Sequence, residues 1–250
     1  MEAGGGAEKL TSPVVPRIVG LFVFLFCEVL NYNYRQMTSV IFTPSDEPYL
    51  GRQLLHAFDN LICSCLELNS KCAPASHGRE LSDFQHAMCI LVPQTITLGL
   101  SIRELIRQGY LFGAKVLVRP FTERAVTALY LFHNPEALKI WKDGWEHRKR
   151  PTLQKMIENL NEKLQKGPVA SLKGITHELN SATHGDPLSA KWNVVLRDDG
   201  LPAFLPSKNL KSSGLADEIC AETIPWLATT MVVMGEAFGQ EEAKSLGGFQ

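Results

Sequence analysis

Apolar side chains recur along most of this chain at intervals of three and four residues, which is the spacing of one helix face. A turn over residues 44–50 precedes the first such stretch, and an amphipathic helix is expected over residues 48–68. Residues 69–78 are polar with a proline and a glycine, which predicts a loop. In the next helical region Pro93 starts or kinks the helix, and Gly109 ends it. Its apolar positions are Phe84, Met88, Leu91, Ile96, Leu98, Leu100, Ile102, Leu105 and Ile106.

Four more helices are predicted before the pattern changes. The most apolar one runs from Tyr110 to Phe132, and a short one follows from Pro135 to Trp145. Thr152 is expected to cap the next helix, and another is expected over Val169 to Leu179. The helix after Thr152 has one apolar face, made by Leu153, Met156, Ile157, Leu160 and Leu164.

A two-stranded segment and a last helix complete the pattern. Alternating residues on both sides of Asp198-Asp199-Gly200 predict a small β-hairpin over 191–205. A long helix is expected from Ser213 to a stop at Gly239. The fold class predicted is mainly α, a helical bundle with one β-hairpin insertion.

The N-terminal residues divide the chain into three parts. Residues 1–16 are rich in glycine and predict a disordered tail, residues 17–43 form an apolar element, and residues 44–245 form a single helical domain. The run from Ile18 to Phe26 is too short for a membrane span and lacks a signal-peptide cleavage site. We therefore expect it to be covered by the bundle, by a second copy of the chain or by a partner protein.

Composition narrows the class of protein. The 250 residues are 45% hydrophobic and 20% charged. Their formal net charge of -1 excludes a strong overall electric field that would attract nucleic acid. The one compact basic cluster, residues 147–151, is typical of a solvated turn. Most of the six cysteines lie in apolar contexts, which favours free thiols and a cytoplasmic location.

A zinc site in residues 63–77 is the alternative use of the cysteines. Its ligands would be Cys63, Cys65, Cys72 and His77, but the paired two-residue gap of structural zinc sites is missing. We therefore expect no metal and no cofactor.

Charge inside the most apolar helix marks a first candidate site. Arg119 and Glu123 are four residues apart, hence on one helix face. A charge on an apolar helix must be paired, solvated or functional. The two residues form either a structural ion pair or one wall of a site.

The stretch HELNSATHGDP, residues 177–187, is a second candidate. We expect a helix to end near Asn180, which puts His177 in a last turn that favours a cation. His184 then lies in a loop, where Asp186 would orient it as a general acid or base. The alternative is that His184 and Asp186 only turn the chain toward Pro187.

An Arg-Pro-x-x-Glu pattern in an apolar helix, then Leu-Asn-x-x-x-His-Gly and a hairpin, resembles uncharacterised bacterial helical families. These are distantly similar to the HEPN superfamily of toxin and phage-defence systems. The resemblance covers residues 94–240 and implies a helical bundle. It also implies metal-free RNA cleavage, with a histidine and an arginine supporting attack by the 2′-hydroxyl.

The chain departs from the motif of active HEPN ribonucleases, in which four to six residues separate an arginine from the histidine that follows it. No arginine precedes His184 at that spacing, where Asn180 and Lys173 are nearest. Arg79 and His86 match it, but with seven histidines about one chance match is expected.

Two functions therefore remain open, and whether the chain is an enzyme stays undecided. One is a binding or assembly module of a bacterial defence or toxin system. The other is a metal-independent ribonuclease with His184 as acid or base, Arg119 at the phosphate, and Glu123 or Asp186 fixing the histidine tautomer. The expected partners are RNA, a partner protein or a second copy of the chain.

Overall fold

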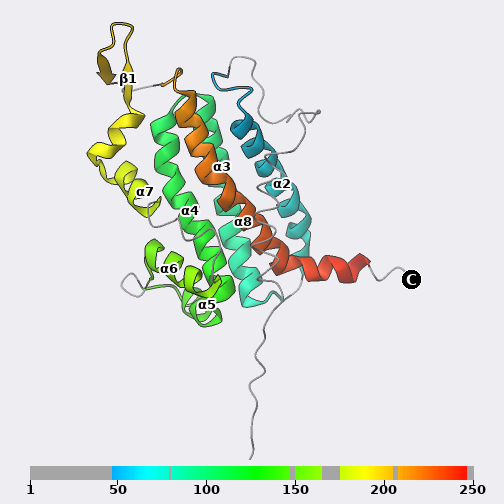
Figure 1. The fold of residues 1–250 in the computed structure, drawn as a ribbon. Coiled ribbons are helices and arrows are strands. Elements are labelled where there is room, and N and C mark those ends of the chain that lie inside the picture. The colour runs from blue at the N-terminus through cyan, green and yellow to red at the C-terminus, as the bar shows by residue number, and fades with distance from the viewer. Residues whose placement is uncertain (1–46, 79, 147–149, 165–174, 205–207, 247–250) are drawn as a thin grey trace, which may run out of the picture.

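The computed structural model describes residues 47–78, 80–146, 150–164, 175–204 and 208–246. The tail over 1–16 and the apolar element over 17–43 lie outside these ranges. Long helices lie side by side (Figure 1): α2 (Gln53–Ala75), α3 (Asp83–Arg107), α4 (Leu111–His133) and α8 (Ser213–Leu246). Shorter helices flank them: α5 (Pro135–Lys142), α6 (Leu153–Leu164), α7 (Ile175–His184) and the 3-10 helix η2 (Pro187–Trp192). The prediction of a mainly α bundle is confirmed.

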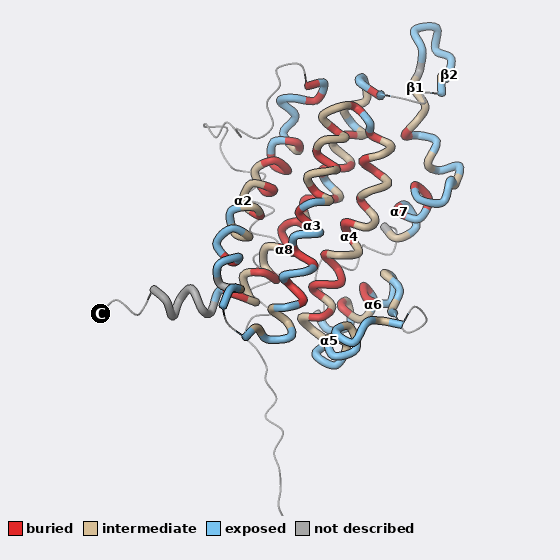
Figure 2. Tube along the Cα trace, turned by 180° about the vertical axis from the view of Figure 1, so that it is seen from behind, coloured by how far each residue is buried: buried red, intermediate tan, exposed pale blue. Residues whose placement is uncertain are grey.

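The core lies where the long helices face one another. Helix α8 packs against α2, α3 and α4, while α6 and α7 pack on α4. Figure 2 shows burial concentrated along these contacts, with α5 and the hairpin largely exposed. Phe121, Ala125 and Val126 on α4 are fully buried, because this helix has neighbours on several sides.

The predicted hairpin is confirmed, but it is shorter than expected. Strands β1 (Val194–Leu196) and β2 (Pro202–Phe204) pair antiparallel, with Val194 opposite Phe204. The first residues assigned to it, Lys191 and Trp192, belong instead to η2. The hairpin projects from one end of the bundle (Figure 1).

Helices α3 and α6 each begin at a capping side chain. Ser82 Oγ accepts from the Gln85 backbone N–H at 3.2 Å, and the Gln85 side chain accepts from Ser82 N at 3.1 Å. This capping box satisfies two backbone donors that α3 would otherwise leave free. Thr152 accepts from Lys155 N at 3.3 Å, as predicted for the start of α6.

Two predicted ends are wrong. Helix α2 continues to Ala75 through the loop expected over 69–78, since it buries Cys72 on the bundle side. Helix α8 continues past Gly239 to Leu246, because one glycine weakens a long helix without ending it.

Pro93, which was expected to start or kink a helix, lies inside one, and so does Pro120. Helix α3 contains Pro93 and helix α4 contains Pro120. Each proline removes one backbone hydrogen bond, and tertiary packing of these largely buried helices offsets the loss.

Gly109 joins α3 to α4 and ties this turn to the far end of the chain. Its φ of +79° is in the left-handed region, which favours glycine. Its carbonyl accepts from Asn209 N at 2.8 Å, four residues before α8 begins.

Among the described helices, α3 is long and apolar enough to cross a membrane by length and composition. The central helix of a bundle has the same composition, and α3 packs against α2, α4 and α8.

Candidate functional site

Arg119 on α4 contacts two other predicted site residues at once. Its Nε donates to Glu123 Oε1 at 3.2 Å, one helix turn away. Its Nη1 lies 3.0 Å from Nε2 of His184 on α7. A guanidinium only donates, so His184 Nε2 accepts in this contact and the ring proton is on Nδ1. The structure thus brings together three of the predicted site residues.

A fourth side chain, which the sequence analysis did not select, completes the group. Arg150, just before α6, has its Nη2 3.6 Å from Glu123 Oε2. We call Arg119, Glu123, Arg150 and His184 the Arg119 cluster. Side-chain exposure is 26% for Arg119, 23% for Glu123 and 51% for Arg150, and His184 is exposed. Two guanidiniums against one carboxylate leave excess positive charge at the surface, which suits an anion.

The position of His184 corrects the prediction for this stretch. Helix α7 does not end near Asn180 but continues to His184, and Gly185 follows it with a φ of +71°. Leu179 and Ala182 are buried, and packing of this face holds the polar stretch in the helix. His184 therefore lies in the last turn of α7, the place expected for His177, which lies seven residues earlier.

Asp186 lies at the start of the following 3-10 helix. Its Oδ1 accepts from Leu188 N at 2.9 Å, and its carbonyl accepts from Ser189 N at 2.9 Å. Among the described residues it has no hydrogen bond or ion pair with the other three predicted site residues. The geometry gives Asp186 the turn-forming role that the sequence left open.

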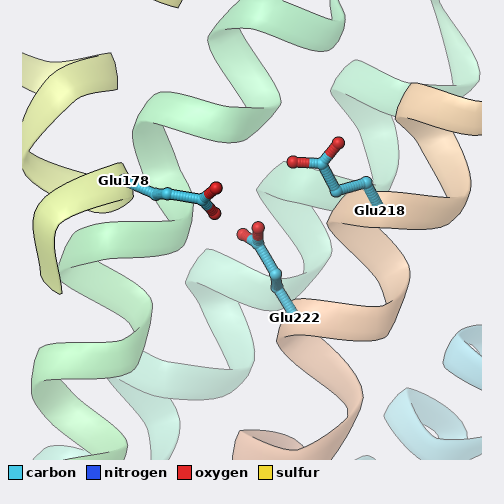
Figure 3. Close-up of side chains that lie close together, drawn as sticks. All are labelled: Glu178, Glu218 and Glu222. Carbon is cyan, nitrogen blue, oxygen red and sulfur yellow. The ribbon is translucent and has the colours of Figure 1, made fainter. Parts of the chain in front are cut away.

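Three carboxylates meet on another part of α7 and on α8. Oxygens of Glu178, Glu218 and Glu222 lie within 4.8 Å of one another, and the side chains point toward a common space (Figure 3). Among the described residues, these three carboxylates are the group whose oxygen atoms lie close enough together to bind one metal ion. We call it the glutamate cluster.

Two lysines offset the charge of the glutamate cluster. Lys115 on α4 contacts Glu222 and lies 3.7 Å from Glu218, which also pairs with Lys191 at 2.8 Å. The ammonium groups lie 4.9 Å and 5.2 Å from the ring centre of Trp192. Lys115 is only 1% exposed. These cations occupy the positions that a metal would have to displace, so the cluster is best described as an ion-pair network joining α4, η2 and α8.

Burial shifts the titration of this network. Burial raises the pKa of the Glu222 carboxyl above its ordinary value, against the opposite effect of Lys115. The hydrogen bond to Glu218 raises the pKa of Lys191. Glu222 Oε2 is buried with no hydrogen-bond partner among the described residues. The network holds more negative charge than it pairs, which costs stability.

A second buried network lies between α2 and α3. Arg103 is fully buried, and its Nη2 donates at 3.0 Å to both Glu47 and Asp59. Burial raises the pKa of Asp59 despite the nearby guanidinium. This group fixes the residues before α2 against α3 and has no exposed face for a ligand.

The zinc alternative loses support from burial. Cys65 and Cys72 are both buried on α2. Burial raises the pKa of Cys65 to about 12, which opposes the thiolate that zinc requires.

Two residues of the buried ion-pair networks, Arg103 and Lys115, were not predicted, although the sequence carries a signal for both. Arg103 and Lys115 are charges within apolar helices, as Arg119 and Glu123 are. The argument that such charges must be paired applied to them equally. Their partners are 44 to 107 residues away, and no spacing rule predicts those.

Comparison with known proteins gives one match. The model of a family of unknown function, DUF5677, matches residues 85–218, more than half of the chain. The matched residues include α3 to the hairpin and the whole Arg119 cluster. Comparisons with curated proteins and with solved structures gave no match. Because this match spans more than half of the chain, the protein belongs to DUF5677, a family of unknown function.

Proposed function

We propose that the chain is a metal-independent ribonuclease that acts at the Arg119 cluster. The observation that carries this proposal is the 3.0 Å contact between Arg119 Nη1 and His184 Nε2 at an exposed position. Metal-free RNA cleavage needs a group that moves a proton and a cation that stabilises phosphate charge. His184 and Arg119 are the right types, in contact, and within reach of solvent.

The proposed step uses the unprotonated Nε2 of His184. On RNA binding, Arg119 turns from the imidazole to a phosphate oxygen, which frees Nε2 to accept the 2′-hydroxyl proton. The 2′-oxygen then bonds to phosphorus and the bond from phosphorus to the 5′-oxygen breaks. The leaving oxygen takes a proton from water, and the hydroxide that results takes the proton back from His184 Nε2. The products are a 2′,3′-cyclic phosphate and a 5′-hydroxyl end.

Glu123 positions the guanidinium in this proposal. Its hydrogen bond to Arg119 Nε fixes one side of the planar group and leaves the Nη atoms to face a phosphate. Asp186 has no part in the step, because its carboxylate caps η2.

The test is cleavage of a labelled single-stranded RNA with a chelator present. We expect cyclic-phosphate products from the parent protein, none from His184→Ala, and none from RNA carrying 2′-deoxyribose at the cut position. His177→Ala is the matched control, since it changes an exposed histidine on the same helix. Full cleavage by His184→Ala, or equal cleavage of the deoxy substrate, contradicts the proposal.

A binding or assembly module is the second candidate. The favouring observation is that Arg119 already has two partners, so the cluster also fastens α7 to α4. In that case His184→Ala lowers the melting temperature, and no RNA cleavage is seen with any variant.

The resemblance to HEPN proteins extends the proposal to a bacterial defence or toxin system in the cytoplasm. Cys65 and Cys220 are buried free thiols, which suits a reducing compartment. Growth arrest on expression, relieved by His184→Ala, is the outcome expected in bacteria. Unimpaired growth with active parent protein would count against a toxin.

A further inference from the structure

Glu123 holds a different guanidinium on each of its oxygens. Oε1 accepts from Arg119, and Oε2 lies 3.6 Å from Arg150. The two arginines come from different elements, α4 and the residues before α6, and meet only at this carboxylate. Two fork-shaped cations on one carboxylate are placed to hold two neighbouring negative groups once Arg150 turns away from Oε2, while Oε1 keeps Arg119 in position.

Arg150 is the more easily released of the two. Its side chain is 51% exposed, and 3.6 Å to Glu123 is longer than a hydrogen bond. Exposed ion pairs of this kind contribute little stability. Arg119, in contrast, is 26% exposed and bound to two partners. A ligand can therefore recruit Arg150 at little cost to the fold.

We propose that Arg150 anchors the phosphate next to the one held by Arg119, so that the site takes single-stranded RNA as a polyanion and not as a single nucleotide. This inference rests on the proposed ribonuclease function. Glu123 competes with that phosphate for Arg150, because its carboxylate repels phosphate and its Oε2 lies beside the Arg150 guanidinium. Attack in line by the 2′-oxygen needs a backbone that can bend, which favours a single strand over a duplex.

The experiment measures RNA affinity against salt concentration, with His184→Ala in every protein so that no RNA is cut. Each phosphate contact on a single strand contributes about 0.7 to the slope of log affinity against log salt. Arg150→Ala should lower the slope by about 0.7, while Arg150→Lys should keep it. Arg197→Ala is the matched control, since Arg197 is 60% exposed and pairs with Asp199 on the hairpin.

A second pair of variants tests the competition. Glu123→Gln should tighten binding of the RNA, and part of that gain should vanish in the Glu123→Gln, Arg150→Ala double variant. A slope unchanged by Arg150→Ala overturns the inference. So does a mononucleotide that binds as tightly as the oligonucleotide.

Failure of the proposed function has a separate signature. If the parent protein cleaves RNA but Arg150→Ala leaves the salt slope unchanged, only the proposed role of Arg150 is contradicted. If RNA binds and Arg150→Ala lowers the slope as expected, but the parent protein never cleaves RNA, only the catalytic step is contradicted. A parent that does not bind RNA overturns both.

Discussion

The guanidinium of Arg119 on α4 lies against the imidazole of His184 at the end of α7, 65 residues later in the chain. Nothing in the spacing of the two residues links them. The contact exists because α7 packs across α4, and because α7 continues to His184 where an earlier end was expected. The stability of that arrangement can be tested separately from any reaction.

Glu123→Ala tests how strongly the Arg119 cluster supports the fold. Both partners of the Arg119–Glu123 pair are about a quarter exposed, so water screens the pair. We expect a loss of about 1 kcal/mol, or about 2–4 °C in melting temperature for a chain of this size. Thermal melts followed by circular dichroism measure it. A loss of 3 kcal/mol or more would mean that the pair is effectively buried.

Lys115→Met and Lys191→Met form a matched pair for the glutamate cluster. Both lysines contact Glu218 and lie over Trp192, but Lys115 is 1% exposed and Lys191 is 47% exposed. Losing the buried Lys115 leaves the partly buried Glu222 without its cation, which costs about 3 kcal/mol, whereas losing Lys191 costs under about 1 kcal/mol. Urea unfolding of the two variants gives both values. Equal losses would show that burial does not set the strength of the network.

His133, the last residue of α4, predicts a dependence of stability on pH. Burial, with a smaller effect of Lys163, lowers the pKa of His133 from 6.5. The unfolded chain therefore binds a proton that the folded chain does not, and this contribution is complete above pH 6.5 and is lost as the pH falls through the folded pKa. His133→Gln should reduce the loss of stability on acidification, measured as the free energy of unfolding against pH. An unchanged pH profile would contradict the prediction.

Gly109→Ala should destabilise the turn between α3 and α4 by two effects. A Cβ at this position would lie 2.6 Å from Leu210 Cδ2 and 3.1 Å from the Asn209 carbonyl oxygen, at a φ of +79°. Gly144→Ala is the control, because Gly144 has a φ of +84° and open space around it. The control isolates backbone strain of about 1 kcal/mol, and Gly109→Ala should cost more. Similar losses in calorimetry would mean that Leu210 and Asn209 move aside freely.

The sequence was sufficient to predict the helices because their apolar faces repeat over many turns. The faces after Thr152 and from Phe84 to Ile106 both correspond to helices. Helix ends were harder to predict. A polar run such as the one from Asn180 to His184 signals an end locally, and only burial of neighbouring Leu179 and Ala182 keeps it helical.

The site was predictable only in part, for a related reason. Arg119 and Glu123 are paired by helix geometry, so four residues of spacing were enough. The approach of Arg150 and His184 depends on how α6 and α7 pack on α4, which no local pattern encodes. Asp186 lies two residues from His184 in the chain, yet its carboxylate serves a backbone N–H.

The packing of α8 against α2, α3 and α4 has a consequence for the order of events during synthesis. The α3–α4 hairpin can form early, since its partners are adjacent in the chain. Yet Ile219, Cys220 and Leu227, which are fully buried, come from the last helix. Until the ribosome has released that helix, the apolar sides of α2, α3 and α4 stay open to chaperones and to other nascent chains. A fragment limited to residues 85–218 would keep the Arg119 cluster, but it would lack most of α8 and leave these apolar sides uncovered.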